Sequence, residues 1–69
     1  LESRGSLAEV NELLDIALPA SESHTIGGFV EARLRHIPAV GEHVVASGWR
    51  FTVDQASDRA IVKLRVERI

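Results

Sequence analysis

Cysteine is absent from this chain of 69 residues, and so is any long apolar run. Without thiols the chain can form neither a disulfide framework nor a cysteine-based zinc site, so packing must hold the fold. No apolar run approaches the roughly 20 residues that a membrane-spanning helix requires. A basic excess is lacking too, because ten acidic side chains stand against eight basic ones and the net charge is −2. That balance argues against a general nucleic-acid-binding protein, and we expect no nucleic acid partner.

The residues that are present indicate one small folded domain spanning 1–69. Hydrophobic residues make up 45% of the chain, which favours a packed core over a disordered tail. A chain of this length buries only about 60% of the surface that its unfolded form exposes, so it is marginal by itself. It starts without methionine at a strand-like Leu-Glu-Ser-Arg-Gly. We therefore expect a domain cut from a longer protein.

A first amphipathic helix is predicted after Gly5. Ser6 and Glu9 match a capping box, in which the serine hydroxyl bonds forward to an N–H of the first turn and the glutamate reaches back. The helix should end before Leu18-Pro19. Its apolar stripe is predicted to consist of Leu7, Val10, Leu13 and Leu14.

A second helix should begin at Thr25, whose hydroxyl can cap the first turn. Pro38 forbids its continuation, because proline lacks an N–H and clashes with the preceding turn. Glu31 and Arg35 are spaced to pair on its exposed face. Its apolar face is predicted to consist of Ile26, Phe29, Val30, Leu34 and Ile37.

Two adjacent glycines, Gly27 and Gly28, lie inside this second helix, where each costs about 0.5–1 kcal/mol relative to alanine. One interpretation is close packing against the sheet or the first helix. The other is a phosphate held at the helix N-terminus, with Thr25, Gly27 and Gly28 as the candidate cofactor-binding residues. We favour packing, because no strand precedes the pair and no glycine-rich fingerprint surrounds it.

After Gly41 the apolar period changes to two, which predicts strands. A short strand at 44–46 leads through a tight turn at Ser47-Gly48 to a second strand from Trp49, and a turn near Ser57-Asp58 leads to a third. With a short initial strand at 1–4, the predicted class is α+β in the order β-α-α-β-β-β, with two helices on one face of a small antiparallel sheet. The inward positions of the last strand are predicted to be Val62, Leu64 and Val66. The expected sheet core is Trp49, Phe51, Leu64 and Val66.

The last hairpin has two candidate registers. One pairs Phe51 with Leu64 and sets Arg50 opposite Arg65, and the other pairs Arg50 with Glu67 and Asp54 with Lys63. Cross-strand charge pairs contribute only about 0.2–1 kcal/mol, whereas turn geometry fixes register, so we prefer the first. It gathers a cationic cluster on the open sheet face, which is our candidate interaction surface; the alternative is an ordinary solvated face. The cluster consists of Arg50, Lys63 and Arg65.

Chemistry-bearing groups are few. His24, His36 and His43 do not have metal-ligand spacing, and twelve helical residues separate the first two by about 18 Å. The serines lack a Gly-x-Ser-x-Gly elbow, and the carboxylates show no pairing typical of an acid/base couple. We therefore expect no metal site and no catalytic residue, and we do not expect an enzyme.

The order of these features resembles the CorC/HlyC transporter-associated domain. A Ser-His pair before Thr25 and the Ser57-Asp58 turn depart from the family's usual residues, and both departures lie in loops. The matching segments are Gly5, Leu-Ala-Glu-Val-Asn-Glu-Leu-Leu at 7–14, Leu18-Pro19, Thr-Ile-Gly-Gly-Phe-Val at 25–30, Ile-Pro-Ala-Val-Gly-Glu at 37–42 and Phe-Thr-Val at 51–53.

The resemblance implies a domain at the C-terminal end of bacterial proteins that carry paired CBS domains, often with an integral-membrane domain before them. The family is associated with magnesium and cobalt efflux and with hemolysin-like proteins. Its fold is similar to half of an FAD-binding PCMH-like architecture. Binding of flavin adenine dinucleotide (FAD) is associated with the family through that similarity alone.

The resulting hypothesis is a non-catalytic regulatory domain that modulates divalent cation transport. It would dock on the CBS domains, on the membrane domain of the same protein or on a second copy of itself. It would act at the cytoplasmic side of the bacterial inner membrane, or in the cytoplasm. The alternative is a nucleotide- or FAD-binding module at Thr25 to Gly28.

Overall fold

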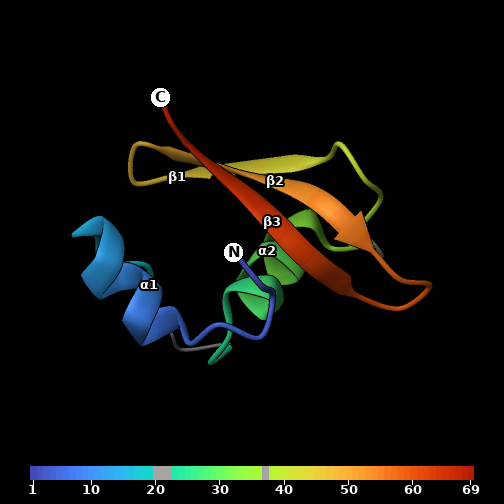
Figure 1. Ribbon diagram of the computed structural model, residues 1–69, viewed down its shortest axis with the longest axis horizontal. Coiled ribbons are helices and arrows are strands. Elements are labelled where there is room, and N and C mark those ends of the chain that lie inside the picture. Colours follow the sequence, from blue (N-terminus) through green and yellow to red (C-terminus); the bar gives the residue numbers. More distant parts are fainter. Residues whose placement is uncertain (20–22, 37) are drawn as a thin grey trace.

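A computed structural model describes residues 1–19, 23–36 and 38–69, and it confirms the α+β class (Figure 1). The three strands form one antiparallel sheet in the order β1-β2-β3, so the predicted meander is correct. The elements are α1 (Leu7–Leu14), α2 (Ile26–Leu34), β1 (His43–Ala46), β2 (Trp49–Ala56) and β3 (Ile61–Arg68).

The predicted initial strand is reduced to a single bridge between Glu2 and Lys63 on the outer edge of β3. There the Ser3 N–H donates to the Val62 carbonyl at 3.0 Å, and the Leu64 N–H donates to the Leu1 carbonyl at 2.7 Å. The N-terminal residues thus cover part of an edge that would otherwise be open.

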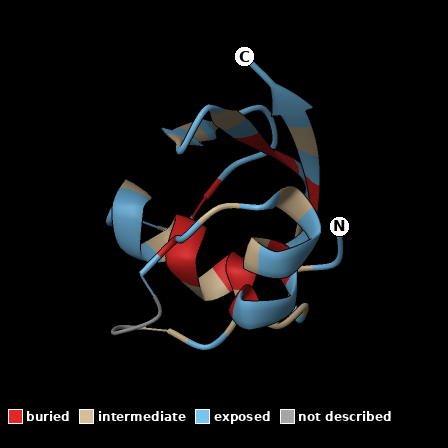
Figure 2. Ribbon diagram, turned by 90° about the vertical axis from the view of Figure 1, so that its left-hand side faces the viewer, coloured by how far each residue is buried: buried red, intermediate tan, exposed pale blue. Residues whose placement is uncertain are grey.

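The core lies between α2 and the inner face of the sheet, with α1 packed beside α2 (Figure 2). Of the expected sheet core, Phe51 and Leu64 are buried, whereas Trp49 and Val66 are half-buried at its margin. The buried apolar residues of the described chain are Leu7, Val10, Leu18, Ile26, Phe29, Val30, Phe51, Val53, Ile61 and Leu64.

The preferred register of the last hairpin is wrong. The structure pairs Arg50 with Glu67 and Phe51 with Val66, as in the alternative register. A shift between Val53 and Gln55 then excludes Asp54 from pairing, so Lys63 faces Gln55 instead. Such bulges place an extra residue on one strand and re-aim the side chains beyond it.

The second shift of this hairpin brings Ile61 opposite Ala56. Ile61 is therefore buried, and Val62, predicted to point inward, is 42% exposed. The turn itself is wider than predicted, because the Ser57 N–H donates to the Ala60 carbonyl at 2.8 Å.

The first helix differs from prediction at its start. Ser6 occupies the N-cap position, but its hydroxyl makes no capping bond. Instead Ser6 bridges to Thr25, and the Leu7 N–H donates to the His24 carbonyl at 2.8 Å. A tertiary backbone contact therefore does what the capping box was predicted to do.

Leu13 is the exception in the predicted apolar stripe of α1, since it is 72% exposed. At about 100° per residue, Leu13 lies a further 60° round the helix from Val10, away from Leu7 and Leu14.

The end of the helix is well defined. Asp15 adopts a left-handed conformation (φ 56°) and the Ile16 N–H donates to the Asn11 carbonyl at 2.9 Å, as in a Schellman motif.

The second helix follows its sequence signals more closely. Thr25 Oγ1 accepts from the Gly28 N–H at 3.1 Å, which confirms the predicted cap. Ile26, Phe29 and Val30 are buried and Leu34 is half-buried, while Ile37 lies outside the described residues. The helix ends at Leu34, before the proline, because Arg35 turns left-handed (φ 61°).

Gly27 packs against the N-terminal segment rather than against the sheet or α1. Its N–H donates to the Ser3 carbonyl at 3.0 Å. A Cβ on Gly27 would lie 2.6 Å from Ser3 Cβ and 2.9 Å from Ser3 O. Only a residue without a side chain permits this approach.

We expect Gly27→Ala to lower the free energy of unfolding by about 1–3 kcal/mol, the usual cost of overpacking. The obstructing atoms belong to the Ser3 backbone and its Cβ, which cannot rotate away. Urea unfolding followed by circular dichroism measures the loss.

Gly28→Ala is the matched control, because its Cβ would overlap mainly with the Ser23 hydroxyl, which can rotate. It should cost less than Gly27→Ala. Equal costs for the two variants would contradict the packing interpretation.

Candidate functional site

The predicted interaction surface lies on the outer face of the sheet, away from the helices. Arg50 projects from β2, and Lys63 and Arg65 project from β3; all three side chains are exposed. The observed register sets Arg65 opposite Thr52, so the two arginines are diagonal neighbours instead of facing each other. The three predicted cations therefore share one face, in a looser arrangement than expected.

Carboxylates accompany these cations, and Glu2 is bridged to Lys63. Glu67 stands opposite Arg50, and its Oε1 lies 4.0 Å from Arg65 Nε. Both side chains of the second pair are largely exposed, 62% for Arg65 and 49% for Glu67. Exposed pairs of this kind contribute little to stability. The outer face, defined here by Arg50, Lys63, Arg65 and Glu67, thus carries three cations, and the exposed Glu2 is added to it beside Lys63 through their bridge.

The helix start at Thr25, Gly27 and Gly28 already uses its hydrogen-bond donors within the chain. The N–H groups of Ile26 and Gly27 donate to Gly5 and Ser3 carbonyls, both at 3.0 Å. The next two N–H groups donate to Thr25, at its hydroxyl and its carbonyl. A phosphate could use these four amides only by displacing these bonds.

The three histidines are spread as expected, with His24 before α2, His36 after it and His43 at the start of β1. Within residues 1–19, 23–36 and 38–69, no group of three potential metal ligands comes together. In the same ranges no ion pair joins Glu31 to Arg35. His36 instead has a partner that the sequence reasoning missed.

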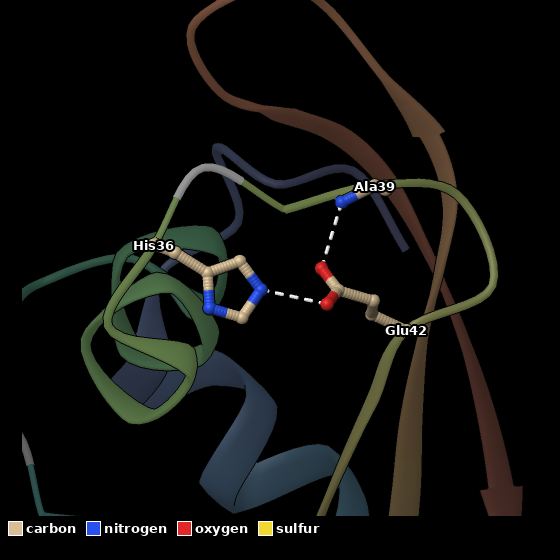
Figure 3. A network of polar contacts seen from close by, with 3 residues as sticks. All are labelled: His36, Ala39 and Glu42. Atoms are coloured by element: carbon tan, nitrogen blue, oxygen red, sulfur yellow. Dashed lines mark hydrogen bonds and ion pairs between the residues drawn. The ribbon is translucent and has the colours of Figure 1, made fainter.

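His36 and Glu42 close the connection between α2 and β1 (Figure 3). His36 Nε2 lies 2.6 Å from Glu42 Oε1, and Glu42 Oε2 accepts from the Ala39 N–H at 2.8 Å. Gly41 takes φ +99°, which places a glycine where the turn requires positive φ. The Glu42 N–H donates to the Ala39 carbonyl at 3.1 Å. The segment from Ala39 to Glu42 therefore forms a turn that its own glutamate holds closed.

The paired groups shift each other's protonation. The hydrogen bond from Glu42, followed by its charge, raises the pKa of His36 above 6.5. The Ala39 N–H, followed by the bond to His36, lowers the pKa of Glu42 below 4.5. Both side chains remain substantially in contact with water, 54% for His36 and 34% for Glu42. Hydrogen bonds to the charged form are the main cause in each case.

These shifts fix the pH range in which the pair stabilises the fold. The raised pKa of His36 gives a contribution that is complete below pH 6.5 and is lost as the pH rises through the folded value. The lowered pKa of Glu42 gives one that is complete above pH 4.5 and is lost as the pH falls through its folded value. The pair therefore contributes most between pH 4.5 and 6.5.

We predict that the ring resonances of His36 titrate above 6.5 and that Glu42→Gln lowers this midpoint. Proton–carbon NMR spectra recorded across the pH range measure it. Glu31→Gln is the control, because this carboxylate on α2 forms no ion pair with His36. An unchanged His36 midpoint in Glu42→Gln would contradict the pairing.

Neither helix in the described part of the chain is long and apolar enough to cross a membrane. Comparison with known proteins matches residues 1–69 to the family described as CorC_HlyC, a transporter associated domain. Magnesium and cobalt efflux protein CorC of Escherichia coli K12 is 34% identical over 62 residues, covering 90% of this chain and 21% of that protein. The protein of the same name from Buchnera aphidicola is 32% identical over 66 residues, which cover 96% of this chain and 23% of that protein.

This chain therefore spans only about a fifth of the length of these curated relatives. Among solved structures, a putative magnesium and cobalt transporter (CorC) associated region from Neisseria meningitidis superposes with a TM-score of 0.96 at 30% identity. The superposition covers all of this chain and 85% of that one. With its whole length matched and its fold shared, the chain belongs to the CorC_HlyC transporter-associated domain family.

Proposed function

We propose that this chain is a non-catalytic regulatory domain of a bacterial divalent cation efflux protein whose cargo is magnesium or cobalt. The full-length family match and the names of the relatives support this context. The domain would act at the cytoplasmic side of the inner membrane. Its task would be to bind other parts of the transporter and so modulate transport.

The outer face of the sheet is the observation that carries the docking proposal. Helices lie over the inner face, whereas three exposed cations stand on the outer one, with Glu67 and Glu2 beside them. These three cations are gathered on a chain whose net charge is −2. An acidic surface on the CBS domains or the membrane domain of the same protein is the complementary partner, because charge complementarity gives docking its specificity.

The hydroxyl groups support a non-catalytic role. Ser23 and Ser57 bond only to backbone groups, within their own turns. Thr25 is used as a helix cap. None of these three hydroxyls bonds to a histidine or carboxylate that could activate it as a nucleophile.

We expect Arg50→Glu with Arg65→Glu, introduced together into the full-length transporter, to weaken docking by about tenfold or more, because like charges facing each other across an interface cost several kcal/mol. Ion flux in vesicles containing the purified transporter should then change.

Arg59→Glu paired with Arg33→Glu is the matched control for this variant. It alters net charge equally, but at the β2–β3 turn and on α2. Transport that is insensitive to reversal of the outer face, or equally sensitive to both double variants, would exclude this face as the docking surface.

The alternative, a nucleotide- or FAD-binding module at Thr25, Gly27 and Gly28, remains a prediction with its own test. The four amides at this helix start are already bonded within the chain. We therefore expect isothermal titration with FAD and with ATP to release no binding heat. Saturable binding heat with either compound would support the alternative instead.

A further inference from the structure

A groove of about 340 Å³ opens between the end of α1 and the turn that joins β1 to β2. It lies at the end of the inner sheet face that α2 does not cover, since α2 packs on β1 and β3 while α1 packs on α2 (Figure 1). Four of its eight lining residues carry apolar side chains, and one charged residue stands on each wall. These residues are Leu14, Ile16, Trp49, Ile69, Asp15 and Arg68.

The walls of this groove are held in place by hydrogen bonds. On the α1 side, the Asn11 side chain donates to the Leu18 carbonyl at 3.0 Å and accepts from the Leu18 N–H at 2.8 Å. On the sheet side, the Ile69 N–H donates to the Gly48 carbonyl at 3.0 Å. The Arg68 guanidinium lies 5.8 Å from the centre of the Trp49 ring, within cation–π range. A groove with ordered walls loses little conformational freedom when it is filled.

An apolar side chain of matching character stands beside this groove. Leu13 precedes the groove residue Leu14 and is 72% exposed, the largest exposed fraction of any large hydrophobic residue in the described chain. Contact with water costs free energy in proportion to the apolar area exposed, so contact of Leu13 with the apolar side chains of such a groove is favourable. Leu13 cannot enter the groove of its own chain, because its side chain points to a different side of α1 from that of Leu14.

The charges at the groove are self-complementary. Asp15 belongs to the α1 wall and Arg68 to the β3 wall, and in the described residues neither forms an ion pair within the chain. A twofold axis relates a patch to itself, so it can bring the acidic wall of one copy to the basic wall of another. A partner of a single charge sign would instead be repelled by one wall.

We propose that this groove is a self-association site. A second copy of the chain inserts its Leu13 there, and Asp15 of each copy faces Arg68 of the other. The contact is isologous and lies on the opposite side of the sheet from the outer face. It leaves Arg50, Lys63 and Arg65 free for a different partner.

Sedimentation equilibrium of the 69-residue chain, from micromolar to millimolar concentration, tests the proposal. Related domains only slightly longer than this one fold as separate chains. We expect a monomer–dimer equilibrium, with the dissociation constant raised about tenfold or more by Leu13→Glu. Val45→Glu, another exposed aliphatic residue but on β1, should leave it unchanged.

Charge exchange provides the second, independent test. Asp15→Lys and Arg68→Glu should each weaken the dimer, and the double variant should restore it toward the original affinity. Arg65→Glu is the matched control, with the same substitution on the same strand but on the outer face. This measurement involves no transport, so it is separate from the test of the outer face.

A chain that stays monomeric throughout the concentration range would overturn the proposal. So would a dimer that Leu13→Glu leaves intact, or single charge variants whose combination restores nothing. A dimer broken by Val45→Glu alone would assign self-association to the β1 edge instead.

Discussion

Backbone hydrogen bonds from residues 1–7 connect every layer of this domain. The carbonyls of Ser3 and Gly5 accept from the first two amides of α2, and the Leu7 N–H donates to the chain just before that helix. The same segment pairs with the edge of β3 through Leu1 and Ser3. A chain with no disulfide and a modest core depends on such contacts, because each buried backbone group must find a partner. Gly27 is the residue that makes the approach sterically possible.

Local signals in the sequence predicted the elements well. The Thr25 cap, the glycine of the Ala39–Glu42 turn and the alternation after it depend on short-range sterics and hydrogen bonding, which a sequence displays directly. The predictions that strands follow Gly41 and that the second helix ends before Pro38 were correct. What these signals did not show was the role of the glutamate in this turn, which requires the position of His36 at the end of α2.

Predictions failed where distant parts of the chain decide the outcome. The register of the last hairpin depends on two register shifts. The predicted register assumed regular pairing from the turn and therefore did not contain them. Ser6 offers a capping hydroxyl, but the bridge to Thr25 supplies the bond from elsewhere. Leu13 looked like part of an apolar stripe, because a leucine's spacing alone does not reveal how little of a short helix touches its neighbours. The face that carries Arg50, Lys63 and Arg65 was predicted correctly even so, because a register change of two residues leaves each side chain on its face.

The pairing of Leu1 and Ser3 with β3 has a consequence for where this domain starts. Its folding unit does not begin with the first helix but includes the segment before it. A variant that lacks residues 1–5 would leave the amides of Ile26 and Gly27 without acceptors. It would also expose the backbone groups of Val62 and Leu64 at the edge of β3. An uncovered strand edge is a template for association with other chains, so the first five residues also protect the domain from aggregation.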